Sequence, residues 1–278
     1  MSQQVSVLYD YLAKFESFFS SFGKNKQTYA IHKKLHFQRF EKTKHLLDIN
    51  EWFLEKLPLN TSGKILDAGC GVGNTLLTLC QKTQMSGLGI SLSKNEIQKA
   101  NRASTYFQLE DRCRFEQRSF DQAMDEKYDT IIAIESLKHA PDLSKALNNL
   151  SQTLKPKGVL IIVEDFGLDH WDNDQRLKQE FLDSWGVQSF YSLKNYTDIL
   201  LAQMEETKTE VYDFTDYMES KNPDQMLGRF RRMNSLKNWV VFPLFKSILS
   251  TFAGGFLLDY FYAKEKVKYQ LLMIQKMT

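Results

Sequence analysis

A turn rich in glycine is the clearest sign of chemistry in this sequence. The segment DAGCGVGN runs from Asp67 to Asn74, directly after the residues KIL, and its three glycines are Gly69, Gly71 and Gly73. Glycine carries no side chain, so the backbone of such a turn can approach a ligand closely. A helix that follows the turn presents free N–H groups to the same ligand. The segment therefore predicts a binding site for a nucleotide-like molecule.

The elements around this turn alternate between short apolar strands and helices. This alternation predicts an α/β fold with a Rossmann-like, doubly wound, mostly parallel sheet and helices on both faces. Ligands of such sheets bind outside the carboxyl ends of the strands, where the glycine turn lies. We expect strands at residues 64–69, 86–90, 113–117, 128–134 and 158–166, and helices at residues 73–82, 93–108 and 142–154.

The patterns change on both sides of this region, which suggests three parts of the chain. A helical lid is expected before the core, and a helical, aromatic insertion is expected before the last strand. The expected parts are a lid at 1–58 with helices at 5–22 and 41–57, a cofactor-binding core at 59–166, and a C-terminal part at 167–278 with helices at 171–185 and 192–206, strands at 207–214 and 266–276, and an insertion at about 214–262.

The spacing of the glycines separates two kinds of nucleotide site. A dinucleotide site would show G-x-G-x-x-G with an acidic residue about 20 positions later. Here the pattern is G-x-G-x-G after Asp67, which resembles motif I of class I S-adenosylmethionine-dependent methyltransferases over residues 60–166. The resemblance implies S-adenosylmethionine as the cofactor, held by Asp67, the three glycines and Asn74. It also implies an acidic residue at the end of the second strand, where this chain has Ile90 and Ser91.

The segment GISLSKNE at that strand end resembles a branch of the family that acts on sterols, tocopherols and cyclopropane-forming lipids. The resemblance implies that Ser91, Leu92 and Glu96 contact the ribose, although Ser91 and Ser93 could also serve only as helix caps. After the third strand, the resemblance implies that Ser119 and Phe120 of the segment RSFD, with Asp121 as a further candidate, contact the adenine.

A third segment, IESLKHAPD, follows the fourth strand and resembles the E-x-x-x-H-x-P-D segment of the sterol methyltransferases. The resemblance places Ile134 beside the cofactor, and Glu135 and His139 over its methyl group as catalytic residues. Two plainer interpretations remain open at this point. Glu135 could be a carboxylate that favours a helix start, and His139 could only brace its loop.

Aromatic residues recur at steps of three or four late in the chain, as on one face of a helix. Pro243 suits the start of that helix, and Gly254 and Gly255 could bend or break it. Such a stripe occurs in ordinary cores, but its place in the insertion favours a substrate lid and pocket wall. The expected substrate-binding residues are Tyr29 and His32 of the N-terminal lid, with Phe242, Phe245, Phe252 and Phe256 of the stripe, which also includes Leu249 and Tyr260.

Two short basic clusters could be solvated surface or could clamp a phosphate group. They are His32, Lys33 and Lys34 near the N-terminus and Arg229, Arg231 and Arg232 in the insertion. Mg²⁺ is expected only if the substrate is a diphosphate. The acidic stretch EDFGLDHWDND could bind a hard cation or be a solvated loop; we expect the loop, and no protein metal site, for its residues Asp165, Asp169, His170, Asp172 and Asp174.

Composition excludes several other classes of protein. The formal net charge of +2 gives no support to a nucleic-acid binder. The three cysteines lack zinc or disulfide spacing, so we expect a cytoplasmic protein. The longest uncharged run of the aromatic stretch, residues 247–258, is too short for the roughly 20 residues of a membrane span. Contact with a membrane surface and homo-oligomers stay open.

These observations together favour methyl transfer to a lipophilic small molecule. The resemblance points to methylation of an isoprenoid carbon, on a prenyl diphosphate or a sterol-like molecule, through a carbocation and with cyclisation as an option. A cation of that kind calls for aromatic faces, exclusion of water and one carboxylate to accept a proton. The alternatives are O- or N-methylation of a lipophilic natural product, and a cofactor-binding protein without catalytic activity.

Overall fold

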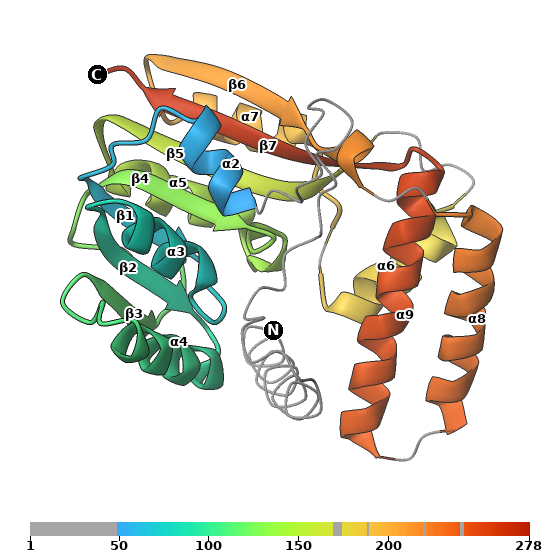
Figure 1. The fold of residues 1–278 in the computed structure, drawn as a ribbon. Helices are drawn as coiled ribbons and strands as arrows, with labels where there is room; N and C mark the ends of the chain where they lie inside the picture. The colour runs from blue at the N-terminus through green and yellow to red at the C-terminus, as the bar shows by residue number, and fades with distance from the viewer. Residues whose placement is uncertain (1–48, 169–173, 188, 219–220, 240–241) are drawn as a thin grey trace, which may run out of the picture.

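The computed structural model describes residues 49–168, 174–187, 189–218, 221–239 and 242–278. A seven-stranded sheet forms its centre, with helices on both faces (Figure 1). The strands are β1 (Lys64–Ala68), β2 (Ser86–Ser91), β3 (Cys113–Gln117), β4 (Tyr128–Ile134), β5 (Leu154–Gly167), β6 (Thr207–Asp213) and β7 (Val267–Lys276). The helices are α2 (Ile49–Lys56), α3 (Asn74–Lys82), α4 (Lys94–Tyr106), α5 (Leu143–Thr153), α6 (Gln175–Trp185), α7 (Leu193–Leu201), α8 (Pro223–Trp239) and α9 (Pro243–Ala263), with short 3-10 turns η2 (Leu137–His139) and η3 (Thr215–Tyr217).

The order of the strands confirms the predicted Rossmann-like α/β fold. The sheet runs β3-β2-β1-β4-β5-β7-β6, and the first five of these strands are parallel. Strand β7 is antiparallel to both of its neighbours, β5 and β6. Strands β1 and β4 are parallel, so the loops after them leave the same edge of the sheet, and the direction of the strand order changes between these two strands. Such a switch point is where open α/β sheets bind ligands.

The central strands are apolar on both sides because helices cover both faces. Neighbouring residues of β4 show this arrangement, since successive side chains of a strand point to opposite faces. Ile132 packs in the cluster that includes α2, α3 and α4, whereas Ile131 packs in the cluster that includes α5 and α7. Both side chains are completely buried. The sheet is therefore a rigid support for the loops at its carboxyl edge.

Two long helices, α8 and α9, form a hairpin that stands beside this edge (Figure 1). Helix α9 leads directly into β7, and a separate apolar cluster joins the hairpin to α6 through Phe181, Phe230, Leu257 and Phe261. The sequence predicted a helix in the α9 region, but not α8, whose arginines and polar residues show only a weak apolar period. None of the described helices is long and apolar enough to cross a membrane.

Helix α9 continues through Gly254 and Gly255, so the expected bend or break is not observed. A Cβ atom on Gly254 would lie 2.3 Å from the Trp185 ring. The Trp185 indole also donates a hydrogen bond to the Thr251 carbonyl of α9 (3.0 Å). Gly254 therefore lets α6 and α9 approach closely, while a Cβ on Gly255 would meet no atom within 4 Å.

The buried face of α9 differs from the predicted aromatic stripe. Three of the aromatic residues in that stripe, Phe242, Phe245 and Phe252, are exposed. The buried face includes Ile248, Ala253, Leu257, Leu258 and Phe261. Because α9 is apolar around most of its circumference, the spacing of its aromatic residues could not identify the buried face.

The two glycines of α9 provide a matched test of this packing. Gly254→Ala should lower stability by about 1–3 kcal/mol, since the added methyl group must displace the rigid Trp185 ring. Gly255→Ala should be neutral or stabilise by up to about 1 kcal/mol, because alanine favours the helix and has free space there. Chemical denaturation of both variants measures the difference. Equal effects at the two positions would contradict the close contact with Trp185.

Candidate active site

The glycine turn after β1 has a backbone that only glycine adopts without strain. Gly69, Gly71 and Gly73 have φ angles of +93°, +52° and +85°. The amides of Gly69 and Cys70 both donate to the Ile90 carbonyl (2.9 Å each), which fixes the turn against the end of β2. A Cβ on Gly69 would lie 2.3 Å from the Ser136 side chain, but a Cβ on Gly71 would meet nothing within 4 Å. The turn is thus packed on one side and open on the other.

Asp67 lies beneath this turn, at the end of β1, with only 3% of its surface exposed. Burial raises its pKa from 3.8 to about 7, although a hydrogen bond from the Leu76 amide of α3 acts in the opposite direction. Its Oδ2 atom and the Nδ2 atom of Asn74 are buried without a hydrogen-bond partner among the described residues. These unpaired polar atoms fit a site that is completed by a polar ligand.

The carboxylate of Glu96, in the first turn of α4, lies beside the end of β2. The Ser91 hydroxyl donates to the Glu96 carboxylate (2.6 Å) and accepts from the Ser93 amide (3.1 Å). Ser93 caps α4 by accepting from the Glu96 amide (3.2 Å). The cap therefore fixes the first turn of α4 and holds Glu96 beside Ser91. A carboxylate in this place can accept hydrogen bonds from hydroxyl groups of a sugar.

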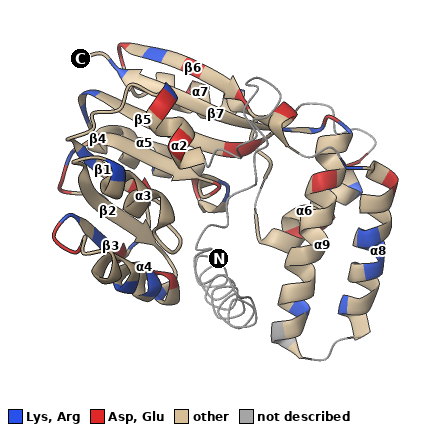
Figure 2. Ribbon diagram, in the orientation of Figure 1, with Lys and Arg blue, Asp and Glu red and all other residues tan. Residues whose placement is uncertain are grey.

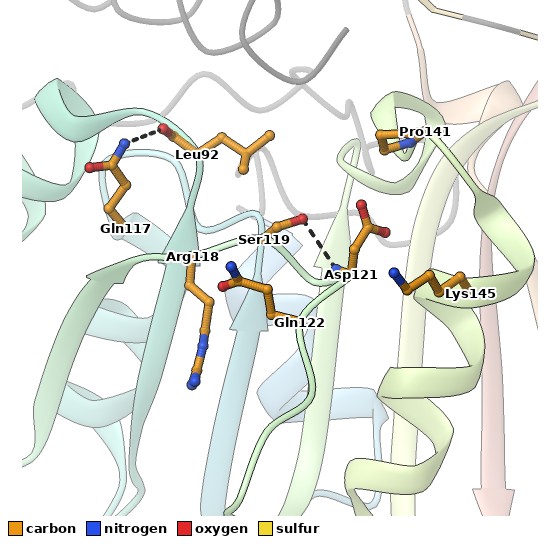
Figure 3. A pocket seen from close by; sticks show the side chains of 8 residues that line it. All are labelled: Leu92, Gln117, Arg118, Ser119, Asp121, Gln122, Pro141 and Lys145. Atoms are coloured by element: carbon orange, nitrogen blue, oxygen red, sulfur yellow. Dashed lines mark hydrogen bonds between the residues drawn. The ribbon is translucent and has the colours of Figure 1, made fainter.

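A pocket of about 440 Å³ opens next to these residues (Figure 3). Within it the Ser119 hydroxyl accepts from the Asp121 amide (3.2 Å), and the Gln117 amide group donates to the Leu92 carbonyl (3.0 Å). Asp121 Oδ1 is a further buried atom without a hydrogen-bond partner in the described part of the chain. The lining residues are Leu92, Gln117, Arg118, Ser119, Asp121, Gln122, Pro141 and Lys145.

The pocket includes three residues that the sequence suggested for the cofactor: Leu92, Ser119 and Asp121. Phe120 lies elsewhere, because its side chain is buried in the core with Tyr128. Ile134 is also buried, as the last residue of β4. The sequence did not identify the lining residues that come from β3 and from the loop before α5, since only the parallel register of the strands brings these segments together.

Glu135 follows β4 directly and is joined to the glycine turn by its neighbour. The Ser136 hydroxyl donates to the Ala68 carbonyl at the end of β1 (2.6 Å). Glu135 has a φ of +50°, which is uncommon for a residue with a side chain, and its amide donates to the Val163 carbonyl (2.8 Å). Its carboxylate accepts a hydrogen bond from the Tyr269 hydroxyl of β7 (2.9 Å). The structure thus brings a fixed carboxylate to the switch point between β1 and β4.

A buried ammonium group lies beside this carboxylate. The Lys138 Nζ atom is 2.8 Å from Asp165, 3.4 Å from Glu164 and 3.9 Å from Glu135. It also lies over the Trp185 ring, 5.2 Å from the ring centroid. Burial opposes the charge of Lys138, but the three carboxylates together raise its pKa well above the usual value. We call Lys138, Glu135, Glu164 and Asp165 the buried charge cluster.

Burial also shifts the pKa values of other groups near the buried charge cluster. The Tyr262 hydroxyl of α9 donates to Asp165, and burial raises the pKa of this tyrosine well above its usual value. Burial raises the pKa of Glu164 to about 7, against the attraction of Lys138. Burial and the nearby Lys138 lower the pKa of His139 to about 3, so its imidazole is neutral near pH 7 and a weak base.

Sequence patterns indicate this cluster only in part. Glu164 and Asp165 stand in an apolar strand, which is unusual for acidic residues, although the stretch that begins with them has the composition of a solvated loop. Lys138 is an unspecified position of the segment E-x-x-x-H between Glu135 and His139. Tyr262 and Tyr269 carried no signal, because their contacts depend on how α9 and β7 meet the sheet.

The predicted substrate residues are distributed differently. Arg229, Arg231 and Arg232 are exposed on α8, and Arg229 lies over the Phe256 ring, 5.8 Å from its centroid. Asp174 is 3.4 Å from the Tyr260 hydroxyl. Tyr29, His32, Lys33, Lys34, Asp169, His170 and Asp172 lie outside the described residues. Among the described residues no three His, Cys, Asp or Glu side chains gather as metal ligands.

Removing the ammonium group should leave buried carboxylates without compensation. We expect Lys138→Met to cost about 3–5 kcal/mol of stability, and Asp165→Asn in the same chain to restore part of this loss. The exposed pair of Lys64 and Glu126 offers a control, for which Lys64→Met should cost less than about 1 kcal/mol. Urea denaturation of the single and double variants measures the coupling, and strictly additive effects would argue against it.

The raised pKa of Asp67 predicts a specific pH dependence. The folded protein holds this proton more tightly than the unfolded chain, so the stabilisation is complete below about pH 4 and is lost as the pH rises through about 7. Asp67→Asn should therefore gain stability relative to the wild type between these values, by about 4 kcal/mol. Thermal unfolding of both proteins without ligand, from pH 4 to 8, gives this difference.

Asp129, near the start of β4, provides a control with the opposite expected pH dependence. Burial of Asp129 works against its charge, but the contact with Lys155 and the amide of Lys64 lower its pKa. Its contribution to stability is present above the ordinary pKa and is lost as the pH falls. Asp129→Asn should thus become more harmful as the pH rises through the acid range, opposite to Asp67→Asn. A flat profile for Asp67→Asn would contradict its raised pKa.

Comparisons with known proteins agree with the geometry of the site. A family model described as "Methyltransferase domain" matches residues 37–203, more than half of the chain. Sterol 24-C-methyltransferase of Debaryomyces hansenii is 33% identical over 146 residues, which cover 50% of this chain and 38% of that protein. Methyltransferase GfsG of Streptomyces halstedii is 33% identical over 123 residues, or 42% of each protein. The matched part thus spans about four tenths of the length of these relatives.

Solved structures share the fold at low sequence identity. Geranyl diphosphate C-methyltransferase from Streptomyces coelicolor A3(2) superposes with a TM-score of 0.70 and 12% identity, over 99% of this chain and 97% of that one. The cyclase SpnF superposes with a TM-score of 0.72 and 17% identity, over 99% and 96%. The chain therefore belongs to the methyltransferase-domain family, as a class I S-adenosylmethionine-dependent methyltransferase that resembles the sterol and terpenoid branch.

Proposed function

We propose that this chain transfers a methyl group from S-adenosylmethionine to a carbon atom of a lipophilic isoprenoid. The observation that carries the proposal is the position of Glu135. Tyr269 holds its carboxylate, and the bond from Ser136 to Ala68 connects its loop to the glycine turn. A fixed carboxylate is thereby placed beside the turn that is expected to bind the cofactor, where methyl transfer can be followed by removal of a proton.

The residues around the glycine turn fit the cofactor. A Cβ on Gly71 would have free space, and buried polar atoms of Asp67, Asn74 and Asp121 have no hydrogen-bond partner among the described residues. We assign Ser91, Leu92 and Glu96 to the ribose, because Glu96 provides the hydrogen-bond acceptor that two vicinal hydroxyl groups require. The pocket lined by Ser119, Asp121 and Pro141 is assigned to the adenine.

The chemistry divides between the cofactor and the chain. When bound, S-adenosylmethionine supplies an electrophilic methyl group, and the protein orients donor and acceptor in line. As an alkene carbon of the substrate takes the methyl group, the neighbouring carbon becomes a cation and must lose a proton. The Glu135 carboxylate can stabilise this charge and accept the proton. His139 is a weaker candidate, because its lowered pKa makes it a poor base.

The proposed acceptor is an isoprenoid, either sterol-like or a prenyl diphosphate, and cyclisation of the cation remains part of the proposal. The named relatives favour this class, since sterol 24-C-methyltransferases are among them. Phe256 and the N-terminal residues Tyr29 and His32 are proposed to line the substrate site. Mg²⁺ is proposed only for a diphosphate acceptor, and no step above depends on it.

A second candidate function is O-methylation of a lipophilic natural product. One relative is the 27-O-demethylrifamycin SV methyltransferase of Amycolatopsis mediterranei, which is 31% identical over 111 residues. An oxygen nucleophile needs at most the loss of its own proton and creates no carbon cation. Carbon methylation therefore requires the charge and basicity of Glu135 more strongly than O-methylation does, and a Glu135 variant can distinguish the two functions.

The test is Glu135→Gln, which keeps the size of the side chain but removes its charge and basicity. Carbon methylation predicts a decrease in kcat by about 10²–10⁴, with unchanged cofactor affinity and with new alkene or alcohol products. O-methylation predicts a milder decrease and no new products. Methyl transfer from labelled cofactor to isoprenoids and to a phenolic acceptor, with mass spectrometry of the products, provides the measurement.

Gly71→Asp serves as the matched control for cofactor binding. Its side chain would occupy the open side of the turn, so calorimetry should detect no binding of S-adenosylmethionine to this variant. Tyr269→Phe should lower kcat less than Glu135→Gln does, since it removes only the hydrogen bond that positions the carboxylate. A wild-type protein that binds the cofactor but methylates neither acceptor would indicate a binding protein without this activity.

A further inference from the structure

The free end of the α8–α9 hairpin carries large apolar side chains that are more than half exposed. Trp239 is 85% exposed, Phe242 71%, Leu236 57% and Phe245 55%. Their exposure is unusual for four large apolar residues within ten positions of the chain, and such patches typically mark interaction sites. We define the hairpin tip as Leu236, Lys237, Trp239, Phe242, Phe245 and Lys246.

Over most of its length, the hairpin carries charge of only one sign. Residues 225–258 contain no Asp or Glu, whereas they contain the cations Arg229, Arg231, Arg232, Lys237 and Lys246. Figure 2 shows these cations along α8 and the lower part of α9, with the acidic positions confined to the other end of the hairpin. Aromatic side chains and cations therefore occur on the same projecting element.

We propose that the hairpin tip docks on the surface of a membrane that contains anionic lipids. Trp and Phe side chains favour the boundary between headgroups and acyl chains, and neighbouring Lys and Arg residues favour anionic headgroups. The two helices project from the sheet, so the tip can reach such a surface without disturbing the core (Figure 1). Docking of this kind involves no membrane span.

Charge argues against two other partners for the tip. A second copy that docks through the same tip would bring the same two cations, Lys237 and Lys246, to the interface, where like charges repel each other. Residues 1–48 of this chain contain eight Lys and Arg residues against four Asp and Glu residues, so they too are basic. An anionic lipid surface is the partner that complements both the apolar and the charged side chains.

Vesicle binding of the full-length protein tests the proposal. The wild type should sediment with vesicles of phosphatidylcholine and phosphatidylserine, and less with phosphatidylcholine alone. Trp239→Ser combined with Phe242→Ser should weaken partitioning by about tenfold or more, since two apolar side chains leave the interface. Tyr106→Ser on α4 is the matched control, because Tyr106 is 80% exposed but lies far from the hairpin along the sheet, and it should not change binding.

Charge variants test the second half of the proposal. Lys237→Gln combined with Lys246→Gln should weaken binding to vesicles with phosphatidylserine by about fivefold for each charge, and added salt should have the same effect. Lys64→Gln combined with Lys194→Gln removes two exposed charges elsewhere and should have little effect. Unchanged thermal unfolding of the serine and glutamine variants shows that the fold is intact.

Three results would overturn the proposal. The first is a wild-type protein that binds no vesicles, or binding that the tip variants do not change. The second is a dimer in solution that the serine variant converts to a monomer, which would assign the tip to a second copy. The third is a photo-crosslinker at position 245 that reacts only with residues 1–48 of the same molecule. Membrane binding is measured without cofactor or acceptor, so its failure is distinct from failure of the proposed methyl transfer.

Discussion

One buried ammonium group holds together the part of the molecule on which the proposed chemistry depends. Lys138 lies within 4 Å of three carboxylates, and two of these also accept a hydrogen bond from a further element. Asp165 accepts a hydrogen bond from Tyr262 of α9, and Glu135 accepts one from Tyr269 of β7. The requirement that buried charges be compensated thus links the loop after β4, the end of β5 and the base of the hairpin.

This arrangement explains why a residue with a strained backbone can persist at the site. Glu135 has a positive φ angle, which costs free energy and persists only because the surroundings hold it in place. Its amide is fixed by β5, its carboxylate by Tyr269, and its neighbour Ser136 by the end of β1. The glycine at position 69 is equally required, because any side chain there would collide with Ser136. The turn that binds the cofactor in our proposal and the carboxylate beside it are therefore one packed unit.

Local patterns were sufficient to predict most of the core. The strands that were expected at 64–69, 86–90, 113–117 and 128–134 differ from the observed ones by no more than one residue at an end, because buried parallel strands are short, apolar and bounded by turns. Strand β5 begins four residues earlier than expected, at Leu154, since Lys155, Pro156 and Lys157 do not resemble a buried strand. The glycine turn was equally visible, because its spacing is a local property.

The hairpin and the buried charge cluster could not be predicted from local patterns, because they depend on contacts between distant segments. Helix α8 has few buried side chains, so its sequence shows little apolar period, and α9 is apolar on too many sides for its buried face to be recognised. The partners of Lys138 are separated from it by up to 27 positions in the ion pairs, and Tyr269 is 134 positions from Glu135. No spacing rule connects such residues before the sheet is assembled.

The position of β7 has a consequence for how the molecule is made. This strand lies between β5 and β6, although it follows both of them in the chain. During synthesis, β5 therefore has an open edge and β6 has no neighbour in the sheet until residues 267–276 have left the ribosome. The hydroxyl of Tyr269 arrives with the same strand, so the carboxylate of Glu135 gains its partner only then. A chain that stalls shortly before this point leaves the edge of the apolar strand β5 unpaired, which makes it a natural substrate for chaperones.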